Sequence, residues 1–181
     1  MTLPPAVEGL WNELQTVREK VLREADGLSQ AQADWRPSDN DWSVGEILHH
    51  LTLAEINTGK LTSKLIKEAD AAGKLAPYPS ELKGFVPLPP PTPGPMEAPP
   101  VVRPEKGHPI AQLLADIKSA RERSRQSIER LASVDARALT WKHFAFGDLN
   151  LAQWWMLQAQ HDADHLQQLR AVKASSGFPK A

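Results

Sequence analysis

Histidine is the residue type whose spacing in this chain best suits chemistry. Six histidines occur among 181 residues, and His161 and His165 lie four positions apart in a segment whose apolar residues recur at helical spacing. On a helix, such a pair lies one turn apart with Cβ atoms about 6 Å from each other, so that two imidazole nitrogens can converge on one ion. A lone pair of this kind also occurs as partly exposed or hydrogen-bonded core histidines, so a third ligand is needed to favour a metal site.

A second segment, the helix expected at about 43–72, offers the third ligand. At 100° per residue, His50 lies on the edge of the apolar stripe of this helix. His49 points nearly opposite and is expected to be solvated or at an interface. His108 and His143 are isolated in connecting segments, although His143 could reach the rim of a bundle. The stripe itself is formed by Val44, Ile47, Leu48, Leu51 and Ala54.

Other polar residues near the histidines have simpler explanations. Glu46 completes a capping box, and Asp162 and Asp164 diverge from the histidine stripe by roughly 60–100°, so that both are expected to be solvated or outside the ligand shell. Gln158 and Gln168 lie on the stripe and could orient an imidazole. No residue is assigned a catalytic role, and three arginines of the third helix are expected on its solvated face: Arg121, Arg123 and Arg125.

Helices must position these residues, because apolar residues recur at helical rather than strand spacing through most of the chain. We expect helices at about 7–26, 43–72, 109–134 and 151–173. Ser43 with Glu46, and Asn150 with Gln153, have the spacing of N-terminal caps. Four amphipathic helices, with short turns at two connections and a long one in the middle, predict an all-α four-helix bundle in a single domain of residues 1–181.

The long connection is rich in proline. Most of the 16 prolines fall between Pro77 and Pro109, which predicts an extended or polyproline crossing over residues 75–108, between the second and third helices. Such a segment is either a functional loop or a disordered linker, and a surface crossover is the simpler interpretation. A weaker alternative is that it docks into an aromatic groove of a partner.

The composition excludes several functional classes. The chain has no cysteine, so any bound metal must use histidine, aspartate or glutamate. Lys+Arg (21) nearly balances Asp+Glu (22), which leaves no overall positive field for nucleic acid or an anionic membrane surface. The start of the sequence lacks the features of a signal peptide, and no apolar run approaches the roughly 18 residues of a membrane span. We therefore expect a cytoplasmic protein.

Two segments resemble DinB-like and YfiT-like proteins. In Trp35–Glu55, the pair Trp42-Ser43 precedes a helix that carries His50 before a leucine. In Phe146–Leu169, a glycine-containing turn and an apolar-polar-apolar start precede the H-x-x-x-H pair, and Gln168 follows the second histidine by three residues. The resemblance covers most of the chain outside residues 75–109. This sequence departs from the family in its proline-rich insertion and in Asn150, where the family often has threonine.

The resemblance implies a DinB-type four-helix bundle, commonly a homodimer, in which His50, His161 and His165 bind a divalent metal ion such as zinc or nickel. Three imidazoles leave at least one position for water or substrate, which is typical of catalytic sites. Similar proteins include metal-dependent hydrolases and transferases that use low-molecular-weight thiols, so we expect one of these activities on a small-molecule substrate. The alternative is a non-enzymatic, stress-associated or metal-sensing bundle. An apolar side of the second helix, with Leu53 and Ile56, is the expected dimer contact.

Overall fold

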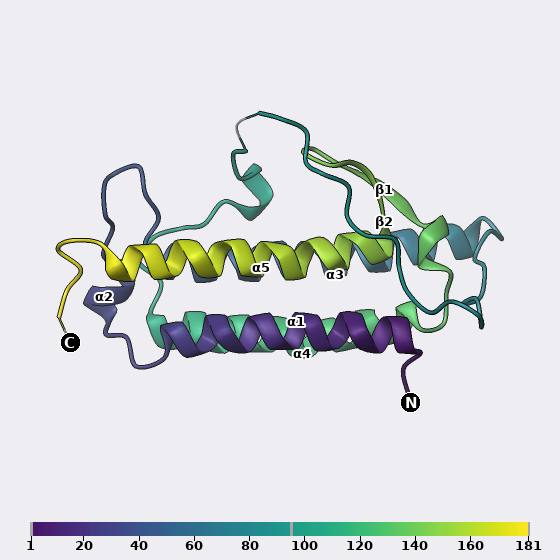
Figure 1. Cartoon of the computed structure of the whole chain (residues 1–181), viewed down its shortest axis with the longest axis horizontal. Helices are drawn as coiled ribbons and strands as arrows, with labels where there is room; N and C mark the ends of the chain where they lie inside the picture. The colour runs from purple at the N-terminus through teal and green to yellow at the C-terminus, as the bar shows by residue number, and fades with distance from the viewer. Residues whose placement is uncertain (1, 95, 181) are drawn as a thin grey trace.

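The computed structural model describes residues 2–94 and 96–180, and the helices within them form a four-helix bundle with a small sheet at one side. The two layers of the bundle are α3 with α5 and α1 with α4, and the proline-rich segment and the sheet lie on the α3 and α5 side (Figure 1). The expected all-α four-helix bundle is confirmed. The α-helices are α1 (Pro5–Ala25), α2 (Gln30–Asp34), α3 (Val44–Ala71), α4 (Ile110–Leu131) and α5 (Leu151–Ala174).

The helices that carry the histidines begin at the expected caps. The Ser43 hydroxyl accepts the Glu46 N–H at 3.1 Å, and the Glu46 carboxylate accepts the Ser43 N–H at 2.9 Å. The same reciprocal pair begins α5, where Asn150 and Gln153 exchange bonds of 2.9 and 3.0 Å. These local bonds satisfy amides that a helix cannot pair internally, so the starting residue of each helix is fixed.

The two connections expected to be short turns contain structure of their own. The short helix α2 lies between α1 and α3, and its capping box of Ser29 and Gln32 was missed at the sequence level. Strand β1 (Thr140–His143) pairs antiparallel with β2 (Gly147–Asn150) between α4 and α5. Gly147, the first residue of β2, adopts a φ of +70°, a conformation that L side chains rarely take.

The third of the expected helices ends earlier than 134. Helix α4 stops at Leu131, and the chain then turns through a 3-10 helix, η2 (Ala136–Ala138). Val134 and Leu139 are buried in the core beside Leu131. Their apolar character extends the helical pattern in the sequence, but they reach the core from a turn, so periodicity overestimated the helix.

Buried apolar side chains form two clusters along the bundle. Trp155 is fully buried in one of them and donates its Nε1–H to the Thr62 hydroxyl at 3.0 Å. Its neighbour Trp154 is only half-buried and donates to the Trp141 carbonyl at 3.2 Å. The two clusters are separate, and on each long helix a buried charged residue lies between them: Arg18, Glu55, Arg121 and Asp162.

The proline-rich segment is a surface crossover that packs against the bundle. Pro77 pairs with Val134, and the Thr92 N–H donates to the Ala145 carbonyl at 2.7 Å, which joins the segment to the hairpin. A 3-10 helix, η1 (Pro100–Val102), then lies against α3. None of the helices within the described ranges combines the length and hydropathy that a membrane-spanning helix needs.

Candidate metal centre

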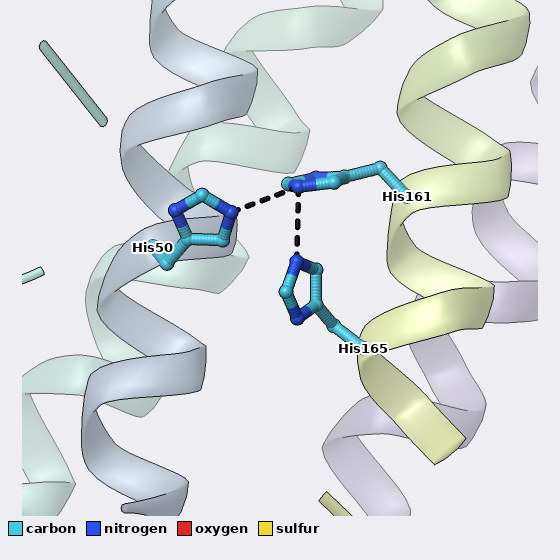
Figure 2. A group of neighbouring side chains, drawn as sticks. All are labelled: His50, His161 and His165. Atoms are coloured by element: carbon cyan, nitrogen blue, oxygen red, sulfur yellow. Dashed lines mark hydrogen bonds between the residues drawn. The ribbon is translucent and has the colours of Figure 1, made fainter. Parts of the chain in front are cut away.

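Three histidines converge between α3 and α5. His50 lies on α3, and His161 and His165 lie one turn apart on α5 (Figure 2). The Nε2 atom of His161 is 2.8 Å from Nε2 of His50 and 3.1 Å from Nε2 of His165. All three candidate ligand atoms lie within 4.8 Å of one another, and they form the one such group of histidines and carboxylates among the described residues. The angular argument that chose His50 over His49 therefore selected the residue that faces the pair.

Hydrogen bonds at the outer ring nitrogen, Nδ1, fix the tautomers of two of these histidines. The Val102 carbonyl lies 2.6 Å from Nδ1 of His50, and the Gln168 side-chain oxygen lies 2.7 Å from Nδ1 of His165. Both oxygens can only accept, so each Nδ1 carries the proton and each neutral ring presents a lone pair at Nε2. A proton on Nε2 of His161 can form a hydrogen bond with only one of these two lone pairs. A cation at the centre could instead accept a lone pair from the Nε2 atom of each of the three rings.

Burial keeps the three rings neutral. It lowers the pKa of His50 to about 4, although the bond to the Val102 carbonyl opposes the shift. Burial and the neighbouring histidines also lower the pKa of His161, and burial lowers that of His165 against the bond to Gln168. Neutral imidazole is the form that binds metals, so the ring nitrogens are ready as ligands at neutral pH.

The donor set fits a divalent transition-metal ion. Imidazole nitrogens suit zinc, nickel and copper, and a Zn–N bond of about 2.0–2.1 Å places tetrahedral ligand nitrogens about 3.3 Å apart. The observed separations of 2.8 and 3.1 Å are shorter by a few tenths of an ångström, which small rotations of the rings can supply.

Trp42 packs against two of the ligands. Its ring is stacked on His165, with centroids 5.9 Å apart and planes 19° apart, and it contacts the His50 ring at a centroid distance of 4.8 Å. Trp42 directly precedes the Ser43 cap, so the start of α3 positions this indole. The indole restricts rotation of both rings from one side of the site.

Known protein families and solved structures include relatives of this chain. A family model described as the DinB superfamily matches residues 13–169, a range that includes all three histidines. The chain belongs to the DinB superfamily. The uncharacterized protein YuaE of Bacillus subtilis (strain 168) is 24% identical over 166 residues, which cover 90% of each chain. The crystal structure of TT2238, a four-helix bundle protein, matches with a TM-score of 0.63 and 18% identity, over 92% of this chain and 99% of that one. At this identity the structural match supports the fold alone.

The remaining histidines of this DinB-superfamily chain lie outside the group. Nδ1 of His49 accepts the Glu105 N–H at 3.0 Å, and its ring lies 4.5 Å from that of His108. His49 therefore contacts the returning proline-rich segment of its own chain. His143 lies on the hairpin in an aromatic cluster, with its ring 5.3 Å from Phe146 and 5.0 Å from Trp154.

The two glutamines expected to orient an imidazole differ in role. Gln168 accepts from His165, as described above, whereas Gln158 is buried and donates to Asp162 at 3.4 Å. Glu46 accepts two bonds from the Arg36 guanidinium in addition to its capping bonds. Its carboxylate is thus fully engaged in structural contacts.

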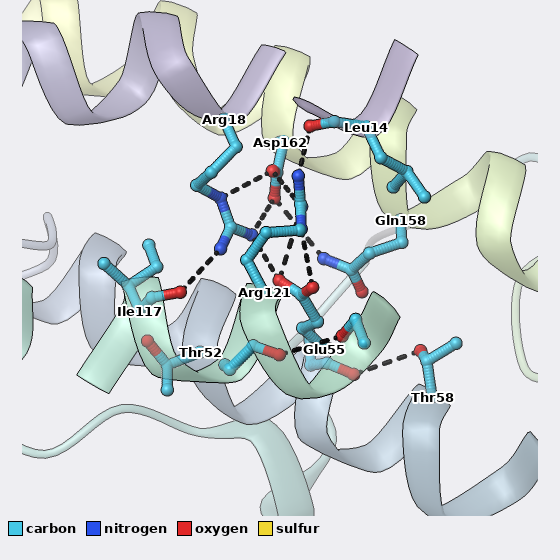
Figure 3. A network of polar contacts seen from close by, with 12 residues as sticks. Leu14, Arg18, Thr52, Glu55, Thr58, Ile117, Arg121, Gln158 and Asp162 are labelled. Carbon is cyan, nitrogen blue, oxygen red and sulfur yellow. Dashed lines mark hydrogen bonds and ion pairs between the residues drawn. The ribbon is translucent and has the colours of Figure 1, made fainter. Parts of the chain in front are cut away.

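Four charged side chains form a buried network, one from each long helix, and Asp162 of this network directly follows His161 on α5 (Figure 3). The expectation that Arg121 is solvated is wrong, because Arg121 is 5% exposed. Of the two alternatives for Asp162, the solvated one is wrong because its side chain is fully buried, whereas its position outside the ligand group holds. Asp162 accepts from Arg18 at 2.8 and 2.9 Å and from Arg121 at 3.1 Å. Glu55 accepts from Arg18 at 2.8 Å and from Arg121 at 2.7 Å. Two positive and two negative charges therefore compensate each other in the core.

The two arginines also bind the helices to each other reciprocally. Arg18 of α1 donates to the Ile117 carbonyl of α4 at 3.2 Å, and Arg121 of α4 donates to the Leu14 carbonyl of α1. Ile117 lies four residues before Arg121 on α4, and Leu14 lies four residues before Arg18 on α1. The sequence does carry a signal for this network, because Arg18 lies between Leu14 and Val21 on the apolar stripe of its helix. An arginine on that stripe faces the core and is therefore expected to be buried and paired.

Proposed function

We propose that His50, His161 and His165 bind one divalent metal ion, zinc or nickel, and that the protein is a metal-dependent hydrolase or thiol S-transferase. The observation that carries the proposal is the convergence of three Nε2 atoms, with Nδ1 of His50 and His165 each donating to an oxygen. Metal-binding histidines commonly donate a hydrogen bond from their second ring nitrogen in this way, because that bond fixes both the tautomer and the orientation of the ring.

The ion, when bound, would act as a Lewis acid that lowers the pKa of a water or thiol toward neutrality. The chain contributes the orientation of its ligands through Val102, Gln168 and Trp42. Glu46 and Asp162 are unsuited to accept a proton, since Glu46 is bound by Arg36 and Asp162 by two arginines. We therefore propose that the chain orients the ligands, and that neither of these two carboxylates acts as the general base.

Elemental analysis of untagged protein tests metal binding. The wild type should carry about one ion per chain, and His161→Ala/His165→Ala should carry none. His108→Ala/His143→Ala is the matched control, because it removes two histidines outside the group and should keep the ion. If the wild type binds no ion after incubation with zinc and nickel, the proposed site is wrong.

Cobalt substitution then separates an enzyme from a structural site. An exchangeable coordination position should let a small thiol such as 2-mercaptoethanol bind, with a new thiolate-to-cobalt absorption band. Absence of that band, together with a large rise in thermal stability on metal binding, would favour the non-enzymatic alternative. One observation supports that alternative: Val102 links the proline-rich segment to His50, so a bound ion would also hold this segment on the bundle.

A further inference from the structure

A groove of about 430 Å³ runs between α3 and α4, on the side of α3 that faces away from the candidate metal centre. Its floor is made by small residues, among them Gly59, Ser124 and Ser127, and its rim carries Lys60 and Ser63 of α3 and Arg123 and Arg130 of α4. Small-molecule sites commonly have volumes of about 300–1,000 Å³, so the groove is large enough for a compact metabolite.

The positively charged side chains on this rim form no ion pair with a described carboxylate. Within the described ranges, Lys60, Arg123 and Arg130 have no carboxylate oxygen within 4.0 Å, although six other arginines of the chain do. The one bond from Arg130 to a neighbouring side chain goes to the hydroxyl of Ser63, at 3.0 Å. Glu55 at the floor is already bound by Arg18 and Arg121, so its charge does not offset those of the rim. Three cations thus surround a space lined with hydroxyl groups.

Gly59 keeps this space open. A Cβ atom built there would lie 3.7 Å from the Ser127 hydroxyl oxygen, so a longer side chain would extend across the groove. Hydroxyl donors on the floor and guanidinium groups at the rim are the groups that bind phosphate oxygens in proteins, and arginine does so with two parallel bonds.

A second groove shows that shape alone does not decide the ligand. It lies between α1 and α5, has a volume of about 390 Å³ and carries one carboxylate and one ammonium group, those of Glu13 and Lys20. The two grooves have similar sizes, but only the one between α3 and α4 combines hydroxyl donors with three cations that form no ion pair with a described carboxylate. Charge therefore selects the class of ligand.

We propose that the groove between α3 and α4 binds the phosphate groups of a small phosphorylated molecule. Arg123 and Arg130 contact the phosphate oxygens, Lys60 provides a third positive charge, and Ser63 and Ser127 donate from their hydroxyls. A nucleic acid is a poorer match, because the net charge of the chain is −1 and acidic residues (22) slightly outnumber basic residues (21). The proposal does not depend on metal binding at the histidines.

Titration of the full chain with inorganic pyrophosphate, followed by amide NMR shifts, tests this site. At about 0.15 M salt, we expect saturable binding with Kd below about 1 mM and shifts centred on Gly59 and Ser127. Arg123→Gln/Arg130→Gln should weaken binding at least about tenfold. Gly59→Leu should weaken it as well, since this change fills the groove and leaves the charges in place.

The matched control is Arg23→Gln/Arg103→Gln, which removes two arginines outside the groove that also lack a carboxylate partner among the described residues. It should leave Kd unchanged within about twofold, whereas equal weakening by both double variants would mean general charge attraction and would overturn the proposal. Shifts centred on His161 and His165 would place pyrophosphate at the metal centre and would also overturn it. So would tighter binding of a single-stranded DNA oligomer with a steep salt dependence. Far-UV circular dichroism of each variant confirms that it is folded.

Discussion

Replacing Arg121 by methionine should destabilise the protein by about 3–5 kcal/mol, the usual cost of breaking a buried ion pair from one side. The Arg121 guanidinium donates to Glu55 at 2.7 Å, to Asp162 at 3.1 Å and to the Leu14 carbonyl. Methionine keeps much of the apolar volume, so the change removes mainly the charge and the donors. Two buried carboxylates then face the single guanidinium of Arg18, and one negative charge is left uncompensated in the core.

Urea unfolding followed by circular dichroism gives the free energy of unfolding by linear extrapolation. Arg123→Met is the matched control, because Arg123 is exposed, lies two positions along the same helix and should change stability by no more than about 0.5 kcal/mol. A loss below about 1 kcal/mol for Arg121→Met, or equal losses for both variants, would refute the reasoning that charge compensation stabilises this core.

A charge-neutral double variant makes the test sharper. Arg121→Met/Glu55→Met removes one charge of each sign and keeps the paired bonds between Arg18 and Asp162. Its loss should be smaller than the sum of the losses of Arg121→Met and Glu55→Met, since neither remaining charge lacks a partner. An additive result would mean that the four side chains do not act as one network.

Four further predictions follow from the contacts described. Gln168→Ala removes the acceptor for His165 Nδ1 and should lower metal affinity about 10–100-fold in a chelator competition, whereas the exposed neighbour variant Gln167→Ala should not. Trp155→Ala should cost about 3–5 kcal/mol in urea unfolding, because Trp155 is fully buried, and the half-buried Trp154 should cost less; equal costs would contradict the placement. The unfolding free energy of the metal-free protein should fall as pH drops from about 6.5 toward about 4, because the unfolded chain takes up a proton at His50 before the folded chain does; a flat profile would contradict the burial of this ring. Static light scattering at high micromolar concentration should report the dimer expected from the side of α3 that carries Leu53 and Ile56, and a monomer would remove that interface.

Glu55 should also contribute to the fall in the free energy of unfolding at low pH. Burial alone would raise the pKa of this carboxyl, but Arg18 and Arg121 outweigh burial and lower the pKa below its ordinary value of 4.5. The contribution of Glu55 to stability is therefore complete above about pH 4.5 and is lost as pH falls through its folded pKa.

The sequence by itself determined the features that depend on near neighbours along the chain. The caps at Ser43 and Asn150 were predicted because a capping box spans only four residues. The His161 and His165 pair was predicted because helical geometry alone places residues four apart on one face. His50 followed from the same angular count, and the fold class followed from four long apolar stripes.

Only the tertiary structure decided which groups meet across helices. Periodicity gives the face on which Asp162 lies, but not that Arg18 and Arg121 occupy the space opposite, so its burial was missed. The Val102 carbonyl reaches His50 because the proline-rich segment packs on α3, and proline restricts backbone angles without specifying where a long segment lies. Contacts between residues distant in sequence depend on the packing of whole elements, which no local pattern encodes.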